Sequence, residues 1–280
     1  GLVGSEMCIR DSRWVHTGHR PNWADVASDP LESPAWHRLD GWMEEFRKRG
    51  LWMITNLCGS PPGSICPERR RLGSRVHDER FDGRFAAFVE GLVRRYGPPG
   101  PLRMIDFWDR PWEWDSPTGW REDSARYRAL YRLVYERAHK ANRRIVVGGT
   151  SSMANTADKF FCLPGGEPML TTTFDVLTDH GVLPHEGFAP RFARRAAIRA
   201  MDTAVWVGSS PALLVAAATH LTAAGYSRVE PAHPEQLFWS NGPAGPMPTP
   251  SAVAANFFLT FLRGLAFERV VFEDHLPWLY

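Results

Sequence analysis

Cysteine is scarce in this sequence, and its spacing gives metal-binding classes little support. Four of the 280 residues are cysteine. Apart from Cys8 near the start, Cys58, Cys66 and Cys162 show none of the paired spacing that zinc sites use. We therefore expect no metal. A disulfide between Cys58 and Cys66, across the loop that carries both, stays open.

An excess of charge of one sign is also lacking. The sequence has 33 Lys and Arg against 31 Asp and Glu, a formal net charge of +2. A protein that binds nucleic acids or membrane surfaces needs a concentrated basic face. The basic cluster at residues 68–71 lies in a Pro/Gly/Ser-rich stretch and is expected to be a solvated loop. No stretch approaches the roughly 18 apolar residues of a membrane span. We expect neither a nucleic-acid nor a membrane partner.

The glycine-rich signature of dinucleotide binding is missing as well. No Gly-x-Gly-x-x-Gly follows any predicted strand. The glycines of "VVGGTSS", residues 146–152, follow a strand but lack the required spacing and a phosphate-binding lysine. The sequence therefore predicts no cofactor.

What the sequence does contain is a regular alternation of strand and helix patterns. Apolar runs typical of buried strands are separated by stretches with the 3.6-residue period of amphipathic helices. The predicted strands are residues 51–57, 102–108, 144–149, 174–180 and 203–207, with one more within 226–239. The predicted helices cover residues 39–46, 81–96, 127–138, 190–202, 213–224 and 253–265.

Such alternation with short connections predicts an α/β fold with a parallel sheet, either a barrel or doubly wound. Hydrophobic residues make up 44% and charged residues 23% of the chain. This composition is ordinary for a globular protein, and the length suffices for one large domain. The unusual feature is the 12 tryptophans. Sugar sites use tryptophan as a flat apolar platform, although core packing is the default role for any single one.

The order of the elements resembles the clan A glycoside hydrolases, particularly their β-xylosidase and α-iduronidase-like branch. "HTGHRPNWAD" resembles the end of that family's second barrel strand, and "FAAFVEGLVRRYG" resembles its helix before the fourth strand. "IDFWDRPWEW" is similar to the fourth strand with its Trp-Asn-Glu-Pro. "FDVLTDHG" resembles the sixth strand and "AVWVGSS" the seventh. The resemblance implies a (β/α)8 TIM barrel.

The resemblance also implies the domain boundaries. The barrel would cover residues 13–267, and residues 268–280 would begin a further strand segment. Residues 1–12, "GLVGSEMCIRDS", resemble translated sequencing-adapter read-through and are expected to be an artefactual leader. The family's first strand is expected to be missing, so the barrel would be incomplete at its N-terminus. Secreted and cytoplasmic locations therefore both stay open.

The family's hydrolysis uses two carboxyl groups about 5 Å apart at the tips of the fourth and seventh strands. By resemblance, the acid/base glutamate falls on Arg110 and the nucleophile on Ser209. Arginine stays protonated and has no proton to give. At an effective dielectric near 20, its charge would also oppose an oxocarbenium ion by roughly 3 kcal/mol. Ser209 has no evident base beside it in the sequence. We expect hydrolysis to be lost or strongly impaired.

The resemblance implies a surviving site for an oligosaccharide or polysaccharide. Its predicted residues are Trp108, Asp109, His180, Trp206 and Trp239. Trp108 could instead fill the barrel, and His180 could be a satisfied buried histidine. Two other functions stay open. One is an active retaining glycosidase with relocated carboxylates, for which the candidates are Glu113, Asp109 and Asp179. The other is a non-catalytic structural or interaction module.

Overall fold

The structure is a computed structural model, and it divides into two units, residues 13–178 and residues 179–280 with 1–12. The described residues are 14–16, 21, 23–26, 36–108, 119–122, 124–152, 175–180, 200–202, 204–205, 230–231, 238–242, 245–250, 253–254, 270–273 and 276–279. No helix among them is long and apolar enough to span a bilayer.

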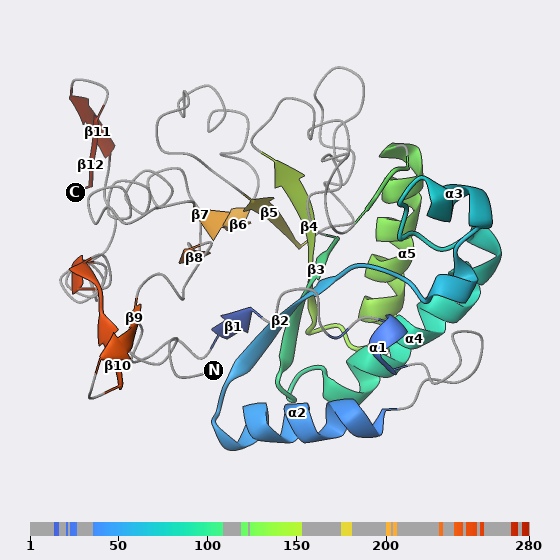
Figure 1. Cartoon of the computed structure of the whole chain (residues 1–280), viewed down its shortest axis with the longest axis horizontal. Helices are drawn as coiled ribbons and strands as arrows, with labels where there is room; N and C mark the ends of the chain where they lie inside the picture. Colours follow the sequence, from blue (N-terminus) through green and yellow to red (C-terminus); the bar gives the residue numbers. More distant parts are fainter. Residues whose placement is uncertain are drawn as a thin grey trace. The chain divides into compact units, whose positions relative to one another are not determined.

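The first unit is built on a sheet whose strands follow the order of the sequence (Figure 1). These strands are β1 (Trp14–His16), β2 (Trp52–Leu57), β3 (Leu102–Phe107), β4 (Val146–Ser152) and β5 (Val176–His180), neighbours in that order. The pairs β1–β2, β2–β3 and β3–β4 are parallel. The predicted parallel α/β fold is confirmed. A doubly wound sheet reverses its strand order, whereas this order does not reverse. Closure into a barrel is not seen among the described strands.

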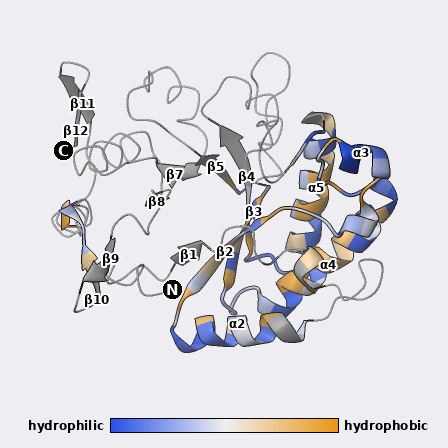
Figure 2. Cartoon of the chain, in the orientation of Figure 1, coloured by the Kyte–Doolittle hydropathy of each residue, from blue (hydrophilic) through white to orange (hydrophobic). Residues whose placement is uncertain are grey.

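The described part of this unit has five helices. They are α1 (Trp23–Val26), α2 (His37–Lys48), α3 (Pro67–Arg71), α4 (Asp82–Tyr96) and α5 (Ser124–Ala141), with 3₁₀ turns at Pro62–Ser64 and Glu79–Phe81. Of these, α2, α4 and α5 are the amphipathic ones that periodicity predicts. Figure 2 shows α3 as strongly hydrophilic, whereas α4 carries hydrophobic and hydrophilic faces. The apolar face of α4 includes Phe85, Phe88 and Leu92, all at most 1% exposed. Each such side chain contributes about 1.5–3 kcal/mol by burial.

Aromatic side chains fasten α5 to the ends of β3 and β4. The ring of Phe107, the last residue of β3, lies 5.2 Å from that of Tyr127 and 5.9 Å from that of Tyr131. The Tyr127 hydroxyl donates to the carbonyl oxygen of Phe107 at 2.9 Å, and the Tyr131 hydroxyl donates to that of Val147 at 3.3 Å. Phe107 therefore faces α5. Because side chains alternate along a strand, Asp106 points to the opposite face of the sheet.

The second unit contains short strands. They are β6 (Ala200–Asp202), β7 (Ala204–Val205), β8 (Glu230–Pro231), β9 (Phe238–Gly242), β10 (Gly245–Pro248), β11 (Val270–Glu273) and β12 (Leu276–Leu279). β7 pairs with β8 in parallel, whereas β9 with β10 and β11 with β12 form antiparallel pairs.

Several predictions for the second unit are confirmed and others need correction. Residues 204–205 are strand, as predicted, and the predicted strand material after 268 is β11 with β12. The predicted helix 190–202 is wrong at its end, because residues 200–202 form β6. Alanine and methionine favour helices locally, but strand pairing outweighs that preference. The stretch 226–239 contains not one strand but β8 and the start of β9.

The remaining elements are tested only in part. The predicted last helix is confirmed at its start, where Val253 and Ala254 are helical and the Val253 N–H donates to the Thr249 carbonyl oxygen at 3.1 Å. The predicted helix 213–224 and the leader lie outside the described residues. The domain boundaries at 13, 267 and 268 stay predictions.

The packing of α4 makes a direct stability prediction. The ring of Phe88 is fully buried and stacks on Trp36 with centroids 5.7 Å apart. Phe88→Ala should lower the free energy of unfolding by about 3–5 kcal/mol, because it leaves a cavity under α4. Urea unfolding followed by tryptophan fluorescence measures this change. The adjacent exposed variant Ala87→Ser is the control, and equal stabilities of the two variants would contradict the described packing.

Candidate functional site

The structure describes some of the residues that the sequence analysis assigned to a site. Trp108 follows β3 directly, Asp179 and His180 end β5, and Trp239 lies on β9, a strand of an antiparallel pair rather than of the parallel sheet. For those last three, the backbone alone is described. The other predicted site residues, Asp109, Arg110, Glu113, Trp206 and Ser209, lie outside the described residues.

Trp108 has an unusual backbone conformation at the carboxyl end of β3. Its φ is +62°, which is a rare conformation for a bulky residue. Its N–H donates to the Leu57 carbonyl oxygen at 3.2 Å, and its ring meets the Trp120 ring edge-on at 4.7 Å. Such backbone strain clusters at functional sites. The side chain of Trp108 is fully buried, so its stacking on a sugar stays a prediction.

The far end of the loop after β3 is fixed against a second loop. The Arg75 N–H donates to the Gly119 carbonyl oxygen at 2.8 Å, and Ser74 Oγ donates to the Trp120 carbonyl oxygen at 3.3 Å. Gly119 has φ +58°, and a Cβ there would collide with the Gly73 carbonyl oxygen. Glycine is therefore required where the two loops meet.

A charged contact strengthens the same junction. Arg69 Nε lies 3.2 Å from Glu122 Oε1, and Arg69 Nη2 lies 3.6 Å from Glu79 Oε1. The expectation of a solvated loop at residues 68–71 is therefore corrected, since these residues belong to helix α3. Pro67 at its first turn favours helix there, and Arg69 reaches across to the loop after β3. Arg70 and Arg71 are exposed.

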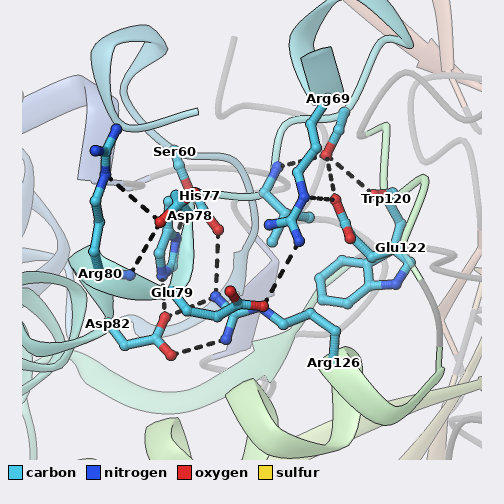
Figure 3. Close-up of polar contacts among 12 residues, drawn as sticks. Ser60, Arg69, His77, Asp78, Glu79, Arg80, Asp82, Trp120, Glu122 and Arg126 are labelled. Atoms are coloured by element: carbon cyan, nitrogen blue, oxygen red, sulfur yellow. Dashed lines mark hydrogen bonds and ion pairs between the residues drawn. The ribbon is translucent and has the colours of Figure 1, made fainter. Parts of the chain in front are cut away.

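A buried hydrogen-bond network holds the loop after β2 (Figure 3). Its members, in order of contact, are Ser60, His77, Asp82 and Arg126. His77 Nδ1 lies 2.9 Å from Ser60 Oγ, and His77 Nε2 lies 2.8 Å from Asp82 Oδ1. Arg126 donates to both oxygens of Asp82, at 2.8 Å and 2.7 Å. The network thus connects the β2 loop, the start of α4 and the start of α5.

Burial and hydrogen bonding shift two pKa values in this network. Burial lowers the pKa of His77 from its ordinary value, and the contact with Asp82 does not compensate. Burial opposes ionisation of Asp82, but hydrogen bonds from Arg126 and His77 outweigh it and lower its pKa to about 2. The folded protein therefore favours a neutral His77 beside an ionised Asp82.

The order Ser60, His77, Asp82 is that of a hydrolytic triad, but the geometry fits a structural role. His77 is fully buried, with its ring 4.7 Å from that of Phe85 and 5.7 Å from that of Trp23. Asp82 is bound in bidentate fashion by Arg126. A nucleophile needs substrate access and oxyanion donors near it. We interpret the network as a fixed support for the β2 loop.

A further polar contact lies within the sheet. Asn56 of β2 and Asp106 of β3 are register partners, and Asn56 Nδ2 donates to Asp106 Oδ2 at 3.2 Å. Both side chains are 1% exposed. The sequence analysis singled out neither residue. The available signal was a polar residue one position before the end of each of two apolar strands.

The alternative of a disulfide between Cys58 and Cys66 is wrong, because the two cysteines are not bonded to each other. Cys58 is buried after the end of β2, whereas Cys66 precedes α3 and its thiol donates to Glu68. The two side chains thus have different surroundings. Among the residues that the structure describes, no group of three His, Cys, Asp or Glu side chains could hold a metal ion.

Comparisons with known proteins identify the fold. No protein-family model and no curated protein matches the sequence. A family 39 glycoside hydrolase from Bacteroides cellulosilyticus matches 98% of the chain with a TM-score of 0.65 at 12% identity. A family 39 β-xylosidase from Caulobacter crescentus matches 92% with a TM-score of 0.62 at 14% identity. The chain spans 65% and 67% of these two proteins.

Other glycoside hydrolases match in the same way. A family 39 enzyme from Xanthomonas axonopodis pv. citri matches 96% of the chain, with a TM-score of 0.63 at 15% identity, and the chain covers 63% of that enzyme. At these identities the likeness shows the fold alone. The chain has an α/β fold with a parallel sheet, structurally similar to clan A glycoside hydrolases.

The shifted pKa values predict that acid destabilises the protein. Below about pH 6.5, His77 binds a proton in the unfolded chain but not in the folded protein. The free energy of unfolding therefore decreases as the pH is lowered. The contribution of Asp82, on the order of 2 kcal/mol, is present above pH 3.8 and is lost as the pH falls toward 2.

Urea unfolding between about pH 7.5 and about pH 5 separates the histidine effect. The parent protein should lose up to about 1.4 kcal/mol per pH unit in this range from His77. His77→Gln should have a shallower pH dependence, because glutamine does not titrate. The reference is the slope of the parent's free energy of unfolding against pH. An unchanged slope in His77→Gln would contradict the prediction, because it would mean that His77 titrates alike in the folded and unfolded states.

Proposed function

We propose that the protein binds an oligosaccharide or polysaccharide at the carboxyl edge of the parallel sheet, without the two-glutamate hydrolysis of the enzymes it resembles. The observation that carries the proposal is the likeness of nearly the whole chain to glycoside hydrolases. Barrel enzymes place their sites at the carboxyl ends of the strands. Residues 108–111, "WDRP", follow β3 at that edge.

The residues at this strand end support the loss of hydrolysis. Arg110 stands two positions after Trp108, where the resemblance implies the acid/base glutamate. A guanidinium carries its proton at every relevant pH, so it cannot protonate a leaving oxygen. Ser209, at the implied nucleophile position, is a poor glycosyl acceptor without an activating base. A binding role requires neither carboxylate.

The loops at the same edge support a binding role. The loop after β2 is held through Ser60 and His77, and Gly119, described after residues 109–118, accepts a hydrogen bond from the Arg75 N–H. Binding is stronger when the contacting loops are ordered before the ligand arrives, because less conformational entropy is lost. Hydrogen bonds thus fix the loop after β2 and the described residues 119–122. Trp108 and Asp109 are the ligand contacts that we propose in the first unit, and His180, Trp206 and Trp239 of the second unit stay predicted contacts.

Hydrolysis assays on variants test the lost chemistry. The parent protein should release no phenol from aryl glycosides with good leaving groups, which need little acid assistance. Arg110→Glu alone should remain inactive because the nucleophile is missing. Ser209→Glu alone should form a glycosyl-enzyme without turnover. The double variant should turn over with retention if the two carboxyl groups lie about 5 Å apart.

The same assays address the alternative of relocated carboxylates. Turnover by the parent protein that Glu113→Gln abolishes would contradict the proposal and establish an active glycosidase. Asp109→Asn and Asp179→Asn are the parallel variants for the other two candidates. Each of the three variants removes one carboxylate with little change in size.

Titration calorimetry tests binding directly. Xylan and glucan fragments should bind with a Kd of roughly millimolar to micromolar. Trp239→Ala and His180→Ala should weaken binding, since each removes a proposed ligand contact. Trp42→Ala, a change at a tryptophan of α2 that is 43% exposed, is the matched control and should bind as the parent does. Equal heats from all proteins across a broad sugar panel would favour an interaction module.

A further inference from the structure

A buried amide oxygen near the carboxyl edge of the sheet lacks a hydrogen-bond partner. Asn56 is 1% exposed, and within the described part of the chain no donor reaches its Oδ1. Its Nδ2 donates to Asp106 Oδ2 at 3.2 Å. A carboxylate accepts hydrogen bonds, so the amide nitrogen turns toward it and leaves Oδ1 as the atom that needs a donor.

The position of this atom relates it to the proposed sugar site. Asn56 is one residue from the end of β2, and Asp106 is one residue from the end of β3. Phe107 faces α5, so Asp106 and its partner Asn56 face the opposite side of the sheet. In a (β/α)8 barrel that side is the interior, below the mouth where ligands bind.

Buried polar atoms in folded proteins almost always have a partner, and an exception indicates a water, an ion or a ligand group. A metal ion fits poorly, since no group of three His, Cys, Asp or Glu side chains is present in the described ranges. An O–H group fits better. It donates one hydrogen bond to the amide oxygen and needs no further ligands from the protein.

We propose that Asn56 and Asp106 form a buried site for one hydroxyl group, with Asn56 Oδ1 as the acceptor. In the unliganded protein the site takes a water molecule, and in the complex it takes a hydroxyl group of the sugar. The water in the unliganded protein is inferred from the geometry of β2 and β3. The sugar hydroxyl in the complex rests in addition on the proposed carbohydrate binding.

Crystal structures of the parent protein, alone and soaked with xylobiose, distinguish the two sources of the hydroxyl. The unliganded crystals should show a water within about 3.2 Å of Asn56 Oδ1. The soaked crystals should show a sugar hydroxyl in its place. Water in both crystals, with xylobiose bound elsewhere, would overturn the sugar half of the proposal. An empty position in both would overturn the whole proposal.

A variant pair gives an independent measurement in solution. Asn56→Leu with Asp106→Leu replaces both polar groups by apolar ones of similar size, which leaves no buried polar atom unmatched. Met104→Leu is the matched control, because Met104 lies on β3 two residues before Asp106 and faces the same side. For the tightest-binding sugar of the panel, the apolar pair should bind about 3- to 10-fold more weakly, and the control should bind normally.

The outcomes separate this proposal from the proposed function. If no sugar binds to the parent protein, the proposed function fails. The unliganded crystals then still show whether a water is bound at Asn56 Oδ1. If a sugar binds to the parent and to the apolar pair with equal affinity, the hydroxyl site fails and the proposed function stands. Should the apolar pair not fold, Asn56→Ser is the replacement variant, since it keeps a polar oxygen but moves it back toward the backbone.

Discussion

The bidentate contact between Arg126 and Asp82 holds together the parts of the first unit that reach the carboxyl edge of the sheet. Arg126 belongs to the first turns of α5, and Asp82 begins α4. Arg126 is buried, and a buried charge that loses its partner costs about 3–5 kcal/mol. Asp82 in turn holds His77, and His77 holds Ser60 in the loop after β2. One charge pair thus fixes two helix starts and one loop.

Apolar packing and directional polar contacts hold different parts of the first unit. The apolar faces of α4 and α5 can be buried by any close-packed set of side chains of the right volume. The loops above the strands have no such face and are fixed by directional contacts instead. Two contacts hold residues 120–122 in the way that His77 holds the loop after β2. They are the ion pair of Arg69 with Glu122 and the hydrogen bond from Ser74 to the Trp120 carbonyl oxygen.

The sequence predicts the repeating part of this fold well and the site less completely. The strand β2, the strand β3 and the helix α4 carry long periodic patterns, and the structure reproduces them within one or two residues. The second unit is harder, because β6 to β8 are two or three residues long and their pairing depends on partners distant in the sequence. The contact of Asp82 with Arg126 joins residues that are 44 positions apart in the chain, and periodicity contains no information about such contacts.

The residues at and after the end of β3 show which features of a site can be predicted from a sequence. The resemblance predicts the chemistry of this strand end, because it puts Arg110 and Ser209 at the positions of the family's two glutamates. The sequence does not predict the geometry, because the backbone conformation at Trp108 and Arg121 follows from tertiary contacts. Both non-glycine residues with positive φ in the described part of the chain, at 62° and 51°, flank the loop that carries Arg110.

Strain of this kind persists only where surrounding contacts enforce it. At Trp108 these contacts are the hydrogen bond to the Leu57 carbonyl oxygen and the edge-on contact with the Trp120 ring. Strained residues of this kind cluster at functional sites, and Trp108 directly follows β3, so the strain at Trp108 accords with the ligand-binding role that we propose for the carboxyl edge of the sheet.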